Sequence, residues 1–160
     1  MNGLLLFHLN LDFSSIDLKE HRHVINTCYY PILKIAKKHN VKISLEFSGK
    51  TLERIFSLDK NFIRELKRLI DKNSIEIVGC GYVQSIGPLL PHQINNLNLQ
   101  EGQNIYSNIL GIRPKTALIS EMTLSHSLID LYLDAGFETI IMDIDNIAES
   151  LNVSKDNLYR

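Results

Sequence analysis

The sequence predicts an α/β fold in which successive β/α repeats build a parallel sheet. Five short segments with strand-like patterns alternate with longer segments in which apolar residues recur every three or four positions. Such alternation is typical of parallel strands joined by right-handed helical crossovers. No internal repeat or linker divides the 160 residues, so we expect one domain.

The strands are expected in the following order. Residues 3–8 form a continuous apolar run, as in a strand that is covered on both faces, and residues 41–47 alternate with a period of two. The other three predicted strands are residues 75–78, 116–120 and 138–143.

Amphipathic helices are expected between these strands. Pro31 should start or kink the first helix, with Ile32, Ile35 and Ala36 facing inward, and a long helix should run from Pro91 to Gly111. The apolar stripes of the other two helices are Leu58, Phe62, Leu66, Leu69 and Ile70, and Leu128, Leu131, Tyr132 and Ala135.

Composition excludes several function classes. With 17 basic and 18 acidic residues, the chain gives no electrostatic reason to expect nucleic acid or a membrane surface as a partner. Cys28 and Cys80 are far apart and are expected to be free thiols. The N-terminal apolar run is too short for a signal peptide and no segment reads as membrane-spanning, so we expect a cytoplasmic protein.

Glu121 is the main candidate for chemistry. It follows the predicted strand 116–120 and precedes residues 122–125, which are expected to open a helix. A carboxylate directly past the C-terminal end of a parallel strand lies where α/β folds place their reactive groups.

Polar side chains also occur in or after the other strands, and parallel strand ends converge at one edge of a sheet. We therefore expect His8, Glu76, Glu121 and Asp143 to meet at one concave face. Carboxylates with an imidazole, an amide and hydroxyls suit a sugar better than a phosphate. The rest of this polar set is Asn10, Glu46, Ser48, Tyr82 and Asp145.

Each of these residues also has a structural interpretation: His8 and Glu76 could be satisfied core residues, and Asp143 could cap the next segment. No His-x-x-x-His or Asp-Asp pair follows an early strand, so neither a metal nor another cofactor is expected.

Several ordered motifs resemble the catalytic domain of glycoside hydrolase family 57, and the resemblance covers residues 3–158. It implies an incomplete (β/α)₇ barrel of the glycoside hydrolase and deacetylase type, acting on an oligo- or polysaccharide without a metal. The matching segments are residues 47–53 (FSGKTLE), 75–82 (IEIVGCGY), 88–91 (PLLP), 118–122 (LISEM), 135–138 (AGFE) and 142–143 (MD).

By this resemblance Glu121 would be the nucleophile of a retaining mechanism on α-glycosidic bonds. The side chains that would bind the sugar are His8, Asn10, Glu76, Tyr82 and Asp143.

The chain departs from the family pattern in three places. His8-Leu9-Asn10 stands in place of His-Gln-Pro, and residues 122–124 replace Arg-Val-Trp, which removes an aromatic sugar platform. The family's acid/base aspartate lies on a later strand, so residues 1–160 are expected to be the N-terminal part of the barrel, inactive alone, with the C-terminal half as a partner.

Two alternatives remain open. One is a complete flavodoxin-like domain with strand order 2-1-3-4-5 that binds a ligand and catalyses nothing. The other is a polysaccharide deacetylase-like enzyme, which would require a metal bound by His and Asp.

Overall fold

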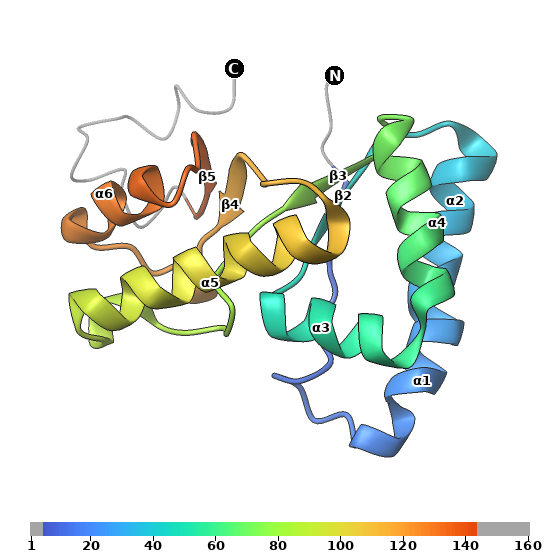
Figure 1. Ribbon diagram of the computed structural model, residues 1–160, viewed down its shortest axis with the longest axis horizontal. Helices are drawn as coiled ribbons and strands as arrows, with labels where there is room; N and C mark the ends of the chain where they lie inside the picture. The colour runs from blue at the N-terminus through green and yellow to red at the C-terminus, as the bar shows by residue number, and fades with distance from the viewer. Residues whose placement is uncertain (1–4, 144–160) are drawn as a thin grey trace.

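A computed structural model describes residues 5–143 of the chain, and the predicted tail 145–160, with Asp145, lies outside them (Figure 1). All strand pairs are parallel, which confirms the predicted β/α repeats. The strands are β1 (Leu6–His8), β2 (Ile43–Glu46), β3 (Ile75–Val78), β4 (Thr116–Leu118) and β5 (Thr139–Ile141).

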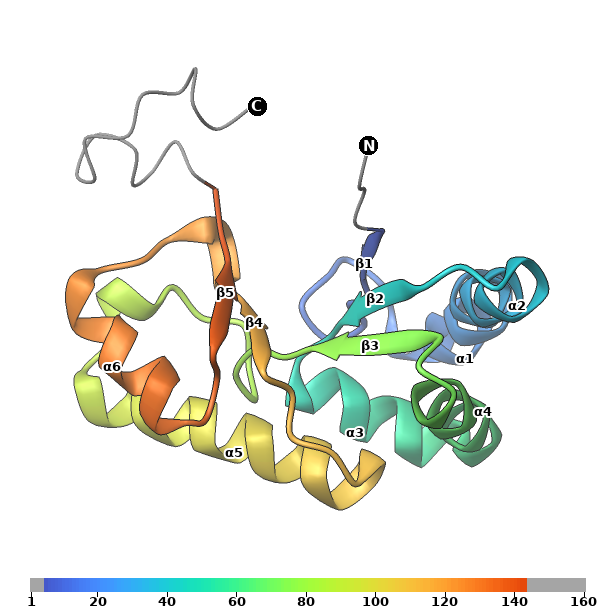
Figure 2. The ribbon, with the colours of Figure 1, turned by 90° about the horizontal axis from the view of Figure 1, so that it is seen from above.

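The strands are arranged in the order in which they occur along the chain. One sheet has the order β1-β2-β3, a second pairs β4 with β5, and a bridge between Gly79 and Ala117 connects the two. A flavodoxin-like order would instead place β1 between β2 and β3. Figure 2 shows the strands following a curve, with helices around its outside and an opening between β1 and β5.

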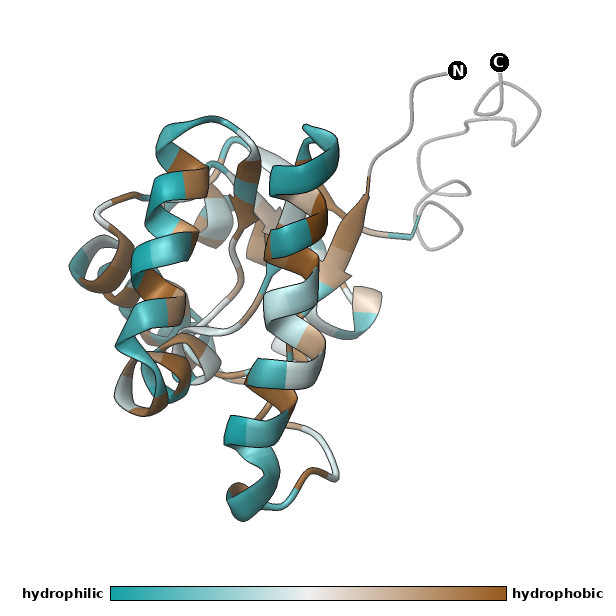
Figure 3. Ribbon diagram, turned by 90° about the vertical axis from the view of Figure 1, so that its right-hand side faces the viewer, coloured by the Kyte–Doolittle hydropathy of each residue, from teal (hydrophilic) through white to brown (hydrophobic). Residues whose placement is uncertain are grey.

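The helices carry apolar residues on the faces that turn toward the strands (Figure 3). Within residues 5–143, none of them is both long and apolar enough to cross a bilayer. The α-helices are α1 (His21–Val24), α2 (Tyr30–His39), α3 (Gly49–Leu58), α4 (Lys60–Asp71), α5 (His92–Leu110) and α6 (His126–Asp134). Shorter turns are η1 (Leu18–Glu20), the π-helical η2 (Ile25–Tyr29), η3 (Gly87–Leu89) and η4 (Ser120–Met122).

The helical segment before β2 differs from its prediction. A π-helical turn ends at Tyr29, two residues before Pro31, which cannot donate a backbone hydrogen bond. The buried stripe runs through Tyr29, Leu33 and Ala36, at spacings of four and three. Ile35 therefore lies outside the stripe and is 47% exposed, so its predicted inward position was wrong.

Between β2 and β3 the chain forms two helices, because Asp59 ends one and begins the next. The Asp59 carboxylate accepts hydrogen bonds from the backbone N–H groups of Asn61 (2.9 Å) and Phe62 (3.0 Å), which caps α4. Ser48 caps α3 in the same way. Both helices pack their apolar faces into the main core, which also includes side chains of β1, β2, β3, α2 and α5.

Helix α5 is bound to the ends of β2 and β3. The buried Tyr106 hydroxyl donates to the carbonyl oxygen of Phe47 and accepts from the N–H of Cys80 at 3.1 Å. Gly102 brings the helix so close that a Cβ atom there would lie 2.7 Å from the Cys80 carbonyl oxygen. These contacts place the segment that follows β3 beside the C-terminal end of β2.

Candidate active site

A cleft with a volume of about 300 Å³ lies at the C-terminal ends of β1, β2 and β4. It brings together two of the residues predicted to meet, His8 and Glu121. The other residues that line it are Glu46, Gln84, Leu118, Ile119, Ser120 and Met122.

Glu121 occupies a left-handed backbone conformation in the turn after β4, with φ 54° and ψ 19°, and Met122 follows with φ 52°. Two consecutive residues of this kind cannot begin an α-helix, so the prediction that residues 122–125 open a helix was wrong; α6 begins at His126. Non-glycine residues in this region are strained, and such strain concentrates at functional sites. The turn leaves the Glu121 side chain exposed at the cleft.

His8 is held from two sides. Its Nδ1 atom is hydrogen bonded to the carboxylate of Glu46, whose side chain is only 2% exposed, and its Nε2 atom lies 3.1 Å from Nε2 of Gln84. The hydrogen bond to Glu46 raises the pKa of the His8 imidazole above its ordinary value of 6.5, and partial burial opposes this effect. The charges of Glu46 and Glu121 raise the pKa further, so Glu121 lies within electrostatic reach of His8.

The raised pKa of His8 predicts that folding stability depends on pH. A group whose pKa is higher in the folded state contributes stability that is fully present below its unfolded pKa and is lost as the pH rises through its folded pKa. We expect the free energy of unfolding to fall as the pH rises above about 6.5, by less than about 1 kcal/mol because His8 is half exposed. Urea titrations of the wild-type chain and of His8→Gln test this.

In the His8→Gln variant this dependence should disappear. The control is His23→Gln, which removes an exposed imidazole of α1. The same pH dependence in wild type and His8→Gln would contradict the assignment.

Asn10 and Tyr82, two predicted sugar-binding residues, lie in different surroundings. Asn10 Nδ2 donates to Gln84 Oε1 at 3.2 Å, but Asn10 itself does not line the cleft. The Tyr82 hydroxyl donates to Glu53 of α3 at 2.8 Å. Tyr82 does not line the cleft, and its backbone carbonyl oxygen accepts from the N–H of Lys50 at the start of α3.

Glu76 and Asp143 do not line the cleft with His8 and Glu121. Glu76 lies opposite Ser44 in the sheet, two positions before the level at which His8 lies opposite Glu46. Its side chain is therefore on the same face of the sheet as theirs, nearer the N-terminal ends of the strands. There it forms an ion pair with Lys42 at 3.5 Å. Asp143 is exposed two residues past the end of β5. That Glu76 and Asp143 bind a sugar therefore stays a prediction.

Gln84 and the role of Glu46 were missed in the sequence. Glu46 ends an alternating strand and belongs to the predicted polar set, but its pairing with His8 depends on the register of β1 and β2. Gln84 lies in a loop held by Asn98 of α5, which bonds Val83 and Ser85 on either side of it. No local pattern in the sequence marks that loop.

Other features of the described chain are less suited to chemistry. Cys28 and Cys80 are free thiols, as predicted. Among residues 5–143, no group of three or more His, Cys, Asp or Glu side chains could hold a metal, and the deacetylase-like alternative would need such a group.

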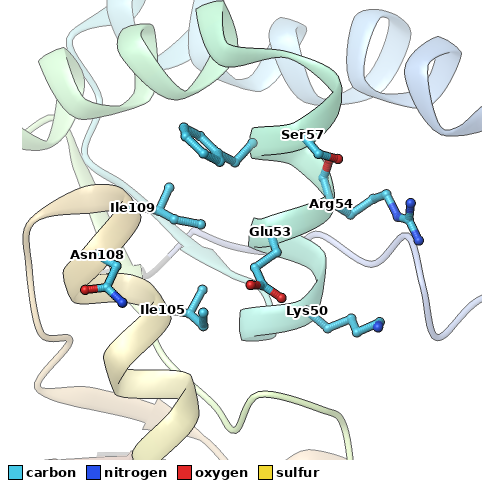
Figure 4. Close-up of a pocket in the computed structure, with 8 residues that line it drawn as sticks. Lys50, Glu53, Arg54, Ser57, Ile105, Asn108 and Ile109 are labelled. Atoms are coloured by element: carbon cyan, nitrogen blue, oxygen red, sulfur yellow. The ribbon is translucent and has the colours of Figure 1, made fainter.

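A larger cavity of about 490 Å³ lies between α3 and α5 (Figure 4). Its charged side chains already have contacts: Arg54 pairs with Asp12, Glu53 accepts from Tyr82, and Lys50 Nζ lies over the Tyr82 ring at 5.9 Å from its centroid. The cleft at His8 and Glu121 is therefore the better candidate for an active site.

Comparison with known proteins places the chain in a family of carbohydrate-active enzymes. Residues 6–160 match the model of the glycosyl hydrolase family 57. The 4-alpha-glucanotransferase of Thermococcus litoralis is 25% identical over 135 residues, which cover 84% of this chain and 20% of the relative. The alpha-amylase of Pyrococcus horikoshii is 25% identical over 134 residues, covering 82% of this chain and 20% of the relative.

Solved structures show the same fold. The 4-alpha-glucanotransferase of Thermococcus litoralis superposes with a TM-score of 0.82 at 22% identity, over 98% of this chain and 24% of that one. A family 4 carbohydrate esterase from Streptomyces lividans gives a TM-score of 0.61 at 12% identity, over 89% of this chain and 64% of that one. The predicted α/β fold of the glycoside hydrolase and deacetylase barrel type is thereby confirmed.

The chain spans about a fifth of the length of the curated relatives that it matches. The family model nevertheless covers nearly all of its residues, from 6 to 160. The chain belongs to glycosyl hydrolase family 57.

Proposed function

We propose that residues 1–160 are the N-terminal part of an enzyme that hydrolyses or transfers α-glycosidic bonds with retention, using Glu121 as the nucleophile. The observation that carries this proposal is the position of Glu121, in a strained turn at the end of β4, beside His8 in one cleft. Family membership supports the reaction class. The names of the relatives, 4-alpha-glucanotransferase and alpha-amylase, support an α-glucan as the substrate.

In this mechanism the Glu121 carboxylate attacks the anomeric carbon, and the glycosidic oxygen leaves with a proton from a general acid. The enzyme then holds the sugar through an ester bond to Glu121. Water or a sugar hydroxyl attacks the same carbon, gives its proton to the resulting general base and releases Glu121, which restores the original configuration. The His8 imidazole, beside Glu121, would orient the sugar.

The second carboxyl group is the open part of this mechanism. Retention requires an acid/base carboxyl about 5 to 5.5 Å from the nucleophile. Glu46 is the other carboxylate that lines the cleft, but its side chain is 2% exposed and is bound to His8, so it is poorly placed to exchange protons with a substrate. We therefore propose that the acid/base group comes from a C-terminal half of the barrel and that residues 1–160 alone do not turn over substrate.

Partners follow from the same proposal. The substrate is an oligo- or polysaccharide, and the C-terminal half of the barrel would cover the opening between β1 and β5. Neither nucleic acid nor a membrane surface is proposed as a partner, because the net charge is only -1. A cytoplasmic location is proposed because both cysteines are free.

The nucleophile can be identified by trapping. A fluorinated α-glucosyl donor slows breakdown of the covalent intermediate, so peptide mass spectrometry should find the label on Glu121 in a form of the protein that turns over sugar. Protein unfolded before exposure serves as the control. A label on a different carboxylate would refute the assignment, and robust turnover by residues 1–160 alone would show that they contain their own acid/base group.

A further inference from the structure

The hydrogen bonds that reach His8 from the loop after β1 all run in one direction. The backbone N–H of Phe13 donates to Asn10 Oδ1 at 2.9 Å, and this fixes the orientation of the Asn10 amide, because a backbone N–H can only donate. Asn10 Nδ2 then donates to Gln84 Oε1 at 3.2 Å. Gln84 therefore presents its amide nitrogen to His8 Nε2, at 3.1 Å.

This direction determines which nitrogen of His8 carries the proton. An amide nitrogen is only a donor, so His8 Nε2 must accept with its lone pair. The single proton of the neutral imidazole then lies on Nδ1, where it donates to the buried carboxylate of Glu46. Each bond from Phe13 to Glu46 is satisfied only in this tautomer.

Opposing groups face His8 from three elements. Glu46 from β2 and Glu121 from η4 favour a second proton on the imidazole. Gln84, from the loop after β3, disfavours it, because a proton on Nε2 would point at the amide hydrogens. Rotating the Gln84 amide would relieve that clash but would break its bond with Asn10.

The loop that carries Gln84 is itself firmly held. Asn98 of α5 accepts from the N–H of Val83 at 2.8 Å and donates to the Val83 carbonyl at 3.0 Å and to the Ser85 hydroxyl at 3.2 Å. These bonds lie on both sides of Gln84, so its side chain starts from a fixed backbone. Glu46 is equally fixed, since it is buried in β2 directly opposite His8.

We propose that Glu46 and Gln84 are positioning residues that hold His8 in the Nδ1-protonated tautomer, with Nε2 bound to the Gln84 amide. The consequence for catalysis, that a sugar meets an imidazole of fixed orientation, rests on the proposed function. The tautomer itself does not, because every bond that sets it lies within the chain.

Nuclear magnetic resonance reads the tautomer directly. In the ¹⁵N-labelled 160-residue chain, ring correlations of His8 are assigned by their loss in His8→Gln. Above the pH at which His8 titrates, we expect Nδ1 at the chemical shift of a protonated ring nitrogen and Nε2 at that of an unprotonated one. The reverse pattern would overturn the proposal.

Two substitutions of Gln84 test its role. Gln84→Glu places a carboxylate opposite Nε2, and the ratio of imidazolium to neutral His8 at a fixed pH should rise by about tenfold or more. Gln84→Leu removes the amide, and the Nε2-protonated tautomer should become populated. The control is Gln93→Glu, because the Gln93 side chain is exposed on α5 and lies outside the cleft. An unchanged His8 in both Gln84 variants would exclude Gln84 as a positioning residue.

The role of Glu46 is tested by Glu46→Gln, which should lower the imidazolium fraction of His8, with Glu53→Gln on α3 as the control. Because Glu46 is buried, the Gln84 variants decide the proposal if this variant does not fold. All these spectra are recorded without sugar. Failure to trap a sugar on Glu121 would therefore leave the tautomer result intact, and a wrong tautomer would leave the nucleophile assignment intact.

Discussion

Glu121→Gln is expected to lower turnover by at least about a thousandfold in a form of the protein that is active, because an amide is a far weaker nucleophile than a carboxylate. The fold should be retained, since the side chain is exposed and the substitution keeps its shape. Steady-state rates on a linear α-glucan and circular dichroism of the same samples measure both effects. No trapped sugar should appear in the variant.

The control for this change is Glu138→Gln, which removes an exposed carboxylate that pairs with Lys115 outside the cleft. It should leave turnover unchanged. His8→Ala should reduce turnover less than Glu121→Gln, because His8 would orient the sugar without forming a bond to it. Undiminished turnover in Glu121→Gln would remove Glu121 from the mechanism.

Gly102→Ala is expected to lower the free energy of unfolding by about 2 kcal/mol or more. The new methyl group would lie 2.7 Å from the Cys80 carbonyl oxygen, 2.9 Å from Gly81 C and 3.0 Å from Tyr82 N. All three are backbone atoms, so α5 or the segment after β3 must move. This loss outweighs the gain of about 1 kcal/mol that alanine has over glycine within a helix.

The matched control is Glu101→Ala, one position earlier on the exposed face of α5. Urea unfolding should show nearly wild-type stability for this control and a lower midpoint for Gly102→Ala. Equal midpoints would mean that the helix and the β3 segment are less tightly packed than their contacts indicate. Because Gln84 follows the displaced segment, the ring signals of His8 should also change in Gly102→Ala only.

The sequence predicted the strands well because their patterns are local. A buried strand such as β3 requires a short apolar run, and β2 shows its alternation in successive residues. The helix break at Asp59 was missed, although an Asp three residues before Phe62 is a usual capping signal. The apolar stripe continues through the break, so its periodicity predicted one helix there instead of two.

The site was predicted only in part, because its geometry depends on long-range contacts. Glu121 could be found from its place after a strand, but its left-handed conformation leaves no sign in the sequence, because no glycine occurs in residues 116–125. The Tyr82 hydroxyl is bound by Glu53 of α3, and the loop that carries Gln84 is held by Asn98. Such contacts join residues far apart in the chain, so local patterns do not reveal them.

The sequential strand order also bears on how the chain folds. Each strand from β1 to β5 is next to its neighbour in sequence, so a new strand joins the edge formed just before it. The paired residues are 23 to 38 positions apart, so each pairing closes a loop of about one β/α repeat and none spans the whole chain. During synthesis β1, β2 and β3 can therefore assemble with their helices before β4 and β5 emerge, and the turn that carries Glu121 forms on an existing sheet.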